Sequence, residues 1–246
     1  MTFDPLLIAL ITAVFLLAGF VKGVIGLGLP TISVGLLSLV MAPAQAAALL
    51  IVPSTITNIQ QMRPRATLVP LTRRLWPMLA GIVAGTLAGG GMITSANAKW
   101  AVVGLGVSLI LYAGLGLAKV QFRVAPRQEG WLGPLVGALT GLVTAATGVF
   151  VIPAVPYLQA IGMEKDELVQ ALGLSFFVST LALAATLAGG NILAGELLWG
   201  SILTLIPALA GQFLGQAARA RIDAGTFKRW FLIGLLALGL ALAVRF

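Results

Sequence analysis

The sequence contains no cysteine and no histidine among its 246 residues. It therefore cannot form a disulfide, a thiolate or imidazole metal site, or a catalytic dyad that uses either residue. Charge is also scarce, since Asp, Glu, Lys and Arg make up only 9% of the residues, against about a quarter of an ordinary soluble domain. The chain has too few charged side chains to cover a water-facing surface, and we expect no metal and no cofactor.

Apolar residues are correspondingly abundant in the sequence. They make up 59% of the chain, and the mean hydropathy is +1.07. Because one span needs about 20 apolar residues, this length predicts an all-α polytopic membrane protein without an extramembrane domain. The net charge of +8 is then better explained by Lys and Arg gathered on the cytoplasmic side than by binding to nucleic acid.

Proline, glycine and charged clusters divide the chain into ten apolar stretches. These cover residues 5–25, 30–41, 44–62, 68–91, 97–118, 131–149, 153–162, 168–189, 197–218 and 229–245. If the N-terminus lies outside and every stretch returns the chain to the opposite face, all of the 15 Lys and Arg residues except Lys99 and Arg245 lie at the cytoplasmic side. That bias predicts an N-out, C-out topology.

The chain also contains a degenerate internal repeat. The run from Gly19 to Pro30 is echoed by the run from Gly141 to Pro153. Further matches follow in the same order, among them Gly81 with Gly211 and Gly85 with Gly215. We interpret residues 1–120 and 131–246 as two transmembrane repeats of five stretches each, joined by a basic cytoplasmic linker at 121–130. Because five is odd, the repeats enter the membrane from opposite faces, as in many secondary transporters.

The glycine-rich turn GFVKGVIGLGLP, the short apolar stretch that follows it, and its second copy GLVTAATGVFVIP resemble the TauE/SafE family of membrane exporters. The resemblance covers essentially the whole chain. It implies a carrier that exports sulfite, sulfoacetate or a related organosulfonate across the bacterial inner membrane. Many relatives have Gly-x-Gly-Gly at the turn, whereas this chain reads Gly26-Leu27-Gly28-Leu29-Pro30, and this difference leaves the anion open.

Two stretches, 30–41 and 153–162, are too short to cross a hydrocarbon core of about 30 Å. Each begins with a proline and follows a glycine, so we expect a helix N-terminus at each break, with the two meeting near the membrane centre. Free N–H groups there, at Ile32 and Phe150 among others, would form an anion site. The candidate residues at these breaks are Gly26, Gly28, Pro30, Thr31, Thr147, Gly148 and Pro153.

Two further candidates are Lys22, the only ionisable residue well inside the glycine-rich region, and Asn58, which ends a polar face. Lys22 either binds the anion or extends its ammonium to the headgroups. Asn58 either lines the path or bonds a neighbouring helix. Ser175, Ser179 and Thr180 form a similar polar face in the second half. Glycines inside the long stretches, such as Gly104 and Gly234, are interpreted as packing contacts.

The seven Asp and Glu residues all fall at stretch ends or in loops, so no carboxylate is expected within the membrane to relay protons or Na⁺. A secondary carrier for a small anion is our first hypothesis, an anion channel the second, and an intramembrane enzyme or scaffold the third. The expected partners are the anion and the lipid bilayer, with a homodimer left open.

Overall fold

A computed structural model describes residues 4–63, 67–93 and 98–244, and within these ranges the protein is all-helical. Arg65 and Arg245, which entered the charge count, lie outside the described residues. The helices are α1 (Pro5–Ile25), α2 (Leu29–Leu37), α3 (Pro43–Gln61), α4 (Leu68–Ala88), α5 (Ala98–Leu117), α6 (Pro126–Thr147), α7 (Ala154–Ala160), α8 (Lys165–Gly189), α9 (Gly195–Leu203), α10 (Leu205–Ala218) and α11 (Ala224–Val244).

Length and composition confirm a polytopic membrane protein. Within the described ranges, six helical segments are long and apolar enough to cross a bilayer. They are Pro5–Ile25, Lys99–Leu117, Pro126–Thr147, Lys165–Gly189, Gly195–Ala218 and Ala224–Val244. The fifth of these segments joins α9 and α10, which are separated only by Thr204.

Several helix ends differ from those that the sequence predicts. The helix α6 begins at Pro126, so the second part of the expected linker is helical, and α11 begins at Ala224 rather than near residue 229. Proline favours the first turn of a helix, which explains why α6 starts at Pro126. The helix α11 starts with a hydrogen bond of 2.8 Å from the Thr226 backbone N–H to the Asp223 carboxylate. Hydrogen bonds from the Thr226 side chain and, to a smaller extent, from its backbone hold the pKa of Asp223 below its usual value.

The two short helices are confirmed as short, and they are shorter than expected. The helix α2 has 9 residues and α7 has 7. Pro30 is the second residue of α2 rather than the first. Pro153 lies outside α7, at the position before Ala154. The preceding helices end alike, since α1 stops at Gly26 with φ of 80° and α6 at Gly148 with φ of 75°, a conformation that favours glycine.

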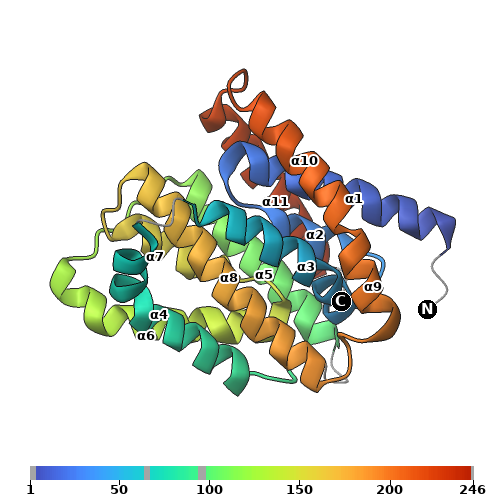
Figure 1. Ribbon diagram of the computed structural model, residues 1–246, viewed down its shortest axis with the longest axis horizontal. Helices are drawn as coiled ribbons and strands as arrows, with labels where there is room; N and C mark the ends of the chain where they lie inside the picture. The colour runs from blue at the N-terminus through green and yellow to red at the C-terminus, as the bar shows by residue number, and fades with distance from the viewer. Residues whose placement is uncertain (1–3, 64–66, 94–97, 245–246) are drawn as a thin grey trace.

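The helices pack in pairs that join the two halves of the sequence. The strongest pairings are α1 with α10, α4 with α6, α5 with α11, and α3 with α8. Figure 1 shows α1 and α10 along one side of the molecule, α4 and α6 along another, and α3 with α8 between them. Two repeats that exchange equivalent helices would produce this pattern. The opposite orientation of the two repeats in a membrane stays a prediction.

Glycine permits the close approach at two of these pairings, as predicted. A Cβ atom at Gly81 or Gly85 of α4 would overlap the backbone carbonyl of Pro134 or Ala138 of α6. The pairing of α10 with α1 is built in the same way, with glycines facing carbonyls one turn apart. Its glycines are Gly211 and Gly215, and the carbonyls belong to Leu16 and Phe20.

The packing interpretation is wrong for Gly234, around which a Cβ would have nothing within 4 Å, whereas Gly104 makes one ordinary contact, 3.4 Å from Thr147. Glycine spacing along a helix therefore does not by itself identify the face that packs.

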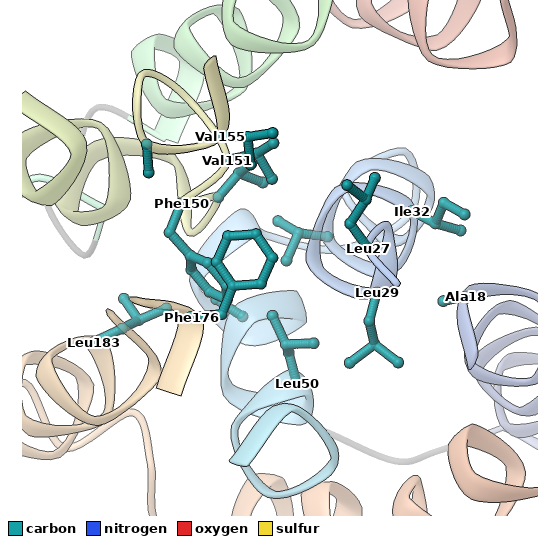
Figure 2. Packing of buried hydrophobic residues seen from close by; sticks show 14 of the residues in the cluster. Ala18, Leu27, Leu29, Ile32, Leu50, Phe150, Val151, Val155, Phe176 and Leu183 are labelled. Carbon is teal, nitrogen blue, oxygen red and sulfur yellow. The ribbon is translucent and has the colours of Figure 1, made fainter. Parts of the chain in front are cut away.

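The two breaks contribute to a single apolar core. Leu27 and Leu29, at the first break, and Phe150 and Val151, at the second, are all buried and belong to one cluster. Figure 2 shows these side chains around Leu50 of α3 and Phe176 of α8. Apolar side chains from both breaks thus belong to the same buried cluster.

Candidate functional site

Lys22 lies in the last turn of α1, and its side chain is only 4% exposed. Its ammonium donates hydrogen bonds to Thr57 Oγ1, at 3.0 Å, and to Asn58 Oδ1, both on α3. The ammonium therefore points into the protein rather than toward the headgroups. Because an ammonium has three N–H donors and both acceptors are neutral, the charge of Lys22 is solvated but not neutralised by these contacts.

A polar chain continues from this contact across the centre of the bundle. Asn58 Nδ2 donates to Ser54 Oγ at 3.1 Å, and Ser54 Oγ shares a hydrogen bond of 2.9 Å with Thr180 Oγ1 of α8. The chain ends where Thr180 donates to the Phe176 carbonyl at 2.6 Å. It thus connects α1, α3 and α8 through side chains that are all buried.

No carboxylate of the described residues pairs with Lys22. The acidic residues lie at helix ends, as predicted. Asp4, Glu164 and Asp223 immediately precede helices, and Glu129, Asp166, Glu167 and Glu196 lie in first helical turns. The amino group of Lys22 is therefore buried without a carboxylate partner among the described residues.

The first break lies beside α1. Gly28 has φ of 115°, and a Cβ there would lie 2.8 Å from Val21, the neighbour of Lys22 in the chain. The Thr31 hydroxyl donates to the Gly28 carbonyl at 3.0 Å. The Ile32 N–H also donates to this carbonyl, at 2.9 Å, so the expectation that the Ile32 donor is free is wrong. A regular first turn of α2 explains this bond.

A glutamine that the sequence did not single out as a ligand holds the end of α1. Gln61 Nε2 donates to the Gly26 carbonyl at 2.9 Å and to the Val169 carbonyl of α8 at 3.1 Å. No local pattern in the sequence indicates that Gln61 contacts two segments so far away along the chain.

The second break lies apart from Lys22 and is bonded within itself. Thr147 donates to the Val143 carbonyl at 2.7 Å and accepts from the Val149 N–H at 3.2 Å. A Cβ at Gly148 would lie 3.0 Å from Ala47 of α3 and 3.6 Å from Val34 of α2. The structure thus brings Lys22 together with Asn58, whereas the Gly148 break contacts α2 and α3 at Val34 and Ala47 and contacts α8 through the Phe150 and Phe176 rings.

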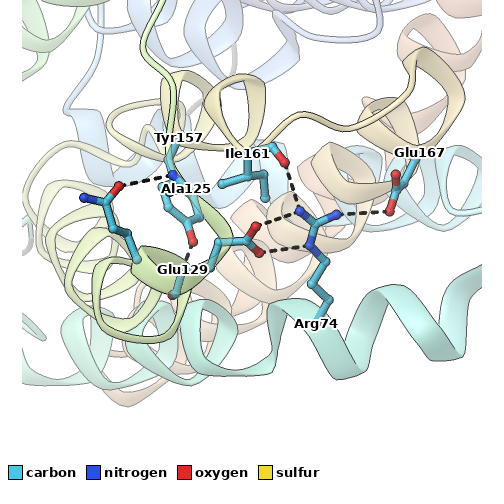
Figure 3. A network of polar contacts seen from close by, with 7 residues as sticks. Arg74, Ala125, Glu129, Tyr157, Ile161 and Glu167 are labelled. Carbon is cyan, nitrogen blue, oxygen red and sulfur yellow. Dashed lines mark hydrogen bonds and ion pairs between the residues drawn. The ribbon is translucent and has the colours of Figure 1, made fainter.

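One end of the molecule is held by a charged cluster around Arg74 of α4. Arg74 makes two hydrogen bonds with the Glu129 carboxylate, at 2.8 and 2.9 Å, and one with the Ile161 carbonyl at 2.9 Å. Its guanidinium also lies 3.6 Å from Glu167 (Figure 3). Glu167 therefore forms an ion pair with Arg74. All four residues lie in segments that the charge pattern places at the cytoplasmic face.

Comparison with known proteins adds a decisive observation. A family model described as sulfite exporter TauE/SafE matches residues 11–242. The chain belongs to this family. The TauE/SafE resemblance drawn from the glycine-rich turns is thereby confirmed, and the chain is a member of a family of membrane transporters rather than of enzymes. No curated protein and no solved structure gave a significant match.

Proposed function

We propose that the protein exports a small sulfur-containing anion, such as sulfite or an organosulfonate, across the bacterial inner membrane and binds it beside Lys22. The observation that carries this proposal is the buried ammonium of Lys22, whose acceptors on α3 are both neutral. A buried charge is costly unless it is paired. An oxyanion beside Lys22 supplies the missing partner, and TauE/SafE membership indicates the class of anion.

Hydroxyl groups close to the polar chain offer additional donors. Ser175 and Ser179 of α8 are buried, and their hydroxyls have no hydrogen-bond partner among the described residues. Ser179 directly precedes Thr180, which belongs to the chain that starts at Lys22. A buried hydroxyl without a hydrogen bond costs free energy. An anion with several acceptor oxygens could accept hydrogen bonds from these two hydroxyls as well as from Lys22.

The breaks at Gly28 and Gly148 form the moving part in this proposal. Two short helices, each preceded by a glycine with positive φ, can rearrange while the glycine-lined pairs α1–α10 and α4–α6 stay intact. An inverted five-plus-five repeat would let one pair rock against the other, so that the site opens to each face in turn. Saturable flux with counterflow distinguishes this carrier from a channel.

The membrane potential is the proposed energy source. With all described carboxylates at helix ends, no acidic relay for H⁺ or Na⁺ is available within the bundle. An inside-negative potential drives a monovalent anion outward by about 2.3 kcal/mol per 100 mV. Export by uniport therefore needs no coupling ion.

Equilibrium binding to the purified protein tests the proposal. We expect wild-type protein to bind sulfite or an organosulfonate, and Lys22→Met to bind it about tenfold or more weakly, because a charge-assisted hydrogen bond is lost. Lys99→Met, which removes an exposed lysine, is the matched control and should bind normally. Normal affinity in a monodisperse Lys22→Met protein, or no binding of any sulfur oxyanion by wild-type protein, would contradict the proposal.

A further inference from the structure

A basic cavity lies at the end of the molecule that the charge pattern places in the cytoplasm. It has a volume of about 710 Å³ and lies between the C-terminal ends of α5 and α7, the start of α11 and the segment 118–125. Three cations line it, and no carboxylate does so among the described residues. The cations are Lys119, Arg123 and Lys228.

A buried hydroxyl also lines this cavity. The Tyr112 side chain is 6% exposed, and its OH group has no hydrogen-bond partner among the described residues. Tyrosine hydroxyls are usually paired when buried, and this unpaired one belongs to a residue that lines a cavity with three positive charges. Both features point to an anionic ligand.

Two carbonyl groups at the end of α7 already accept hydrogen bonds. The Ala160 carbonyl accepts from the Val124 N–H at 3.0 Å, and the Ile161 carbonyl accepts from Arg74 (Figure 3). The first of these bonds also ties the segment 118–125 to α7. The segment that carries Lys119 and Arg123 is thus hydrogen-bonded to the end of α7.

The cavity ends close to the first break. Leu232 of α11 lines it, and the preceding residue, Phe231, lies 3.4 Å from the position that a Cβ of Gly28 would occupy. Gly28 in turn lies against Val21, next to Lys22. Phe231 therefore lies against the first break, and it is the residue next in the chain to one that lines the basic cavity.

We propose that this cavity is the cytoplasmic vestibule of the transporter, in which a small oxyanion is bound by Lys119, Arg123, Lys228 and the Tyr112 hydroxyl before it passes Phe231. The inference rests on the proposed function for the identity of the anion, but the site itself does not depend on Lys22. Like charges that line a concave surface raise the local concentration of their counter-ion and accelerate its capture.

Transport kinetics from the cytoplasmic face test the vestibule. In proteoliposomes of known orientation, the triple variant Lys119→Asn, Arg123→Gln, Lys228→Gln should raise the KM for sulfite on that face about tenfold, with little change in kcat and a weaker dependence on ionic strength. Asn is used at Lys119 because the backbone there has φ of 51°, a conformation that asparagine tolerates. Tyr112→Phe should raise the same KM about threefold or more.

The control removes an equal charge from the same face, outside the cavity. The variant Arg73→Gln, Arg219→Gln, Arg221→Gln changes three exposed arginines and should keep the wild-type KM. An equal effect of both triple variants, or no effect of the cavity variant, would overturn the proposal. A cavity effect seen only in vesicles with phosphatidylglycerol would overturn it too, because the ligand would then be a lipid headgroup.

A binding measurement separates failure of the vestibule from failure of the proposed function. Lys22→Met protein in lipid-free detergent should retain weak binding of sulfite, and the cavity triple variant in that background should abolish it. Loss of this residual site with the cavity variant supports the vestibule even if wild-type protein carries no sulfite. Residual binding that survives the cavity variant, or no residual binding at all, refutes the vestibule.

Discussion

Lys22 and Asn58 are the two residues on which the proposed chemistry depends. The amide oxygen of Asn58 accepts from the ammonium, while its nitrogen donates to Ser54 at 3.1 Å. Asparagine thus orients Lys22 without cancelling its charge. A carboxylate at the same position would form an ion pair with Lys22 and leave no requirement for an external anion.

Asn58→Asp is therefore expected to keep the fold and to lose the ligand. The substitution preserves the acceptor for Lys22, and the hydroxyl chain can reverse, with Ser54 donating to the new carboxylate and Thr180 donating to Ser54 in place of the Phe176 carbonyl. We expect the affinity for sulfite to fall at least about tenfold, or about 1.4 kcal/mol, while the melting temperature of the ligand-free protein stays equal or rises. Calorimetry on both proteins measures this, and unchanged affinity in Asn58→Asp would show that the charge of Lys22 is not what holds the anion.

Gly28 and Gly148 are poor sites for a test of binding, although the sequence suggests them. A Cβ at Gly28 would lie 2.8 Å from Val21, and one at Gly148 would lie 3.0 Å from Ala47. Both glycines also have positive φ. A larger residue at either position strains the backbone and the packing, so loss of transport would say nothing about a ligand.

At the scale of helices, the paired crossings hold the transporter together. No hydrophobic driving force acts between helices within lipid, so close packing at small residues is the main attraction. In the pair of α4 with α6, Gly85 lies against the carbonyl of Ala138. The equivalent contact in the pair of α1 with α10 is between Gly215 and the carbonyl of Phe20.

Gly85→Ala should separate α4 from α6 and lower the stability of the protein by about 1–3 kcal/mol, a typical cost of overpacking. Gly234→Ala is the matched control, because a Cβ there meets nothing within 4 Å, and it should be neutral or slightly stabilising through helix propensity. Thermal unfolding in detergent compares the two. Equal melting temperatures for Gly85→Ala and Gly234→Ala would mean that the α4–α6 contact does not stabilise the bundle.

Local sequence patterns predicted the helices and much of their packing, but not the partners of the site. Hydropathy located the spans, and the Gly-Pro breaks located both short helices, because these signals are local. Gly81 and Gly234 have similar sequence surroundings, yet only the first packs. The contacts of Lys22 with Thr57 and of Gln61 with Val169 join residues far apart in sequence. The cavity beside Tyr112 depends on the path of a segment that the sequence marks only as a basic linker.

For the whole molecule, the account requires opposite orientation of the two halves. The chain contains no cysteine, so single cysteines introduced at exposed positions give a clean topology assay. Gln121→Cys should react with a membrane-impermeant maleimide only from the cytoplasmic face, and Asn191→Cys only from the external face. Labelling of both from the same face would contradict the ten-span topology and the inverted repeat with it.

The most direct test of the central claim is the efflux of sulfite from proteoliposomes under a clamped membrane potential. Wild-type protein should show saturable efflux. At equilibrium, an inside-negative potential of 100 mV should make the external concentration of a monovalent anion about 50-fold higher than the internal concentration. Lys22→Met protein of normal melting temperature should lose at least about nine-tenths of the initial rate at low substrate. Efflux that is equal in wild-type and Lys22→Met protein would show that the buried lysine is not the anion site.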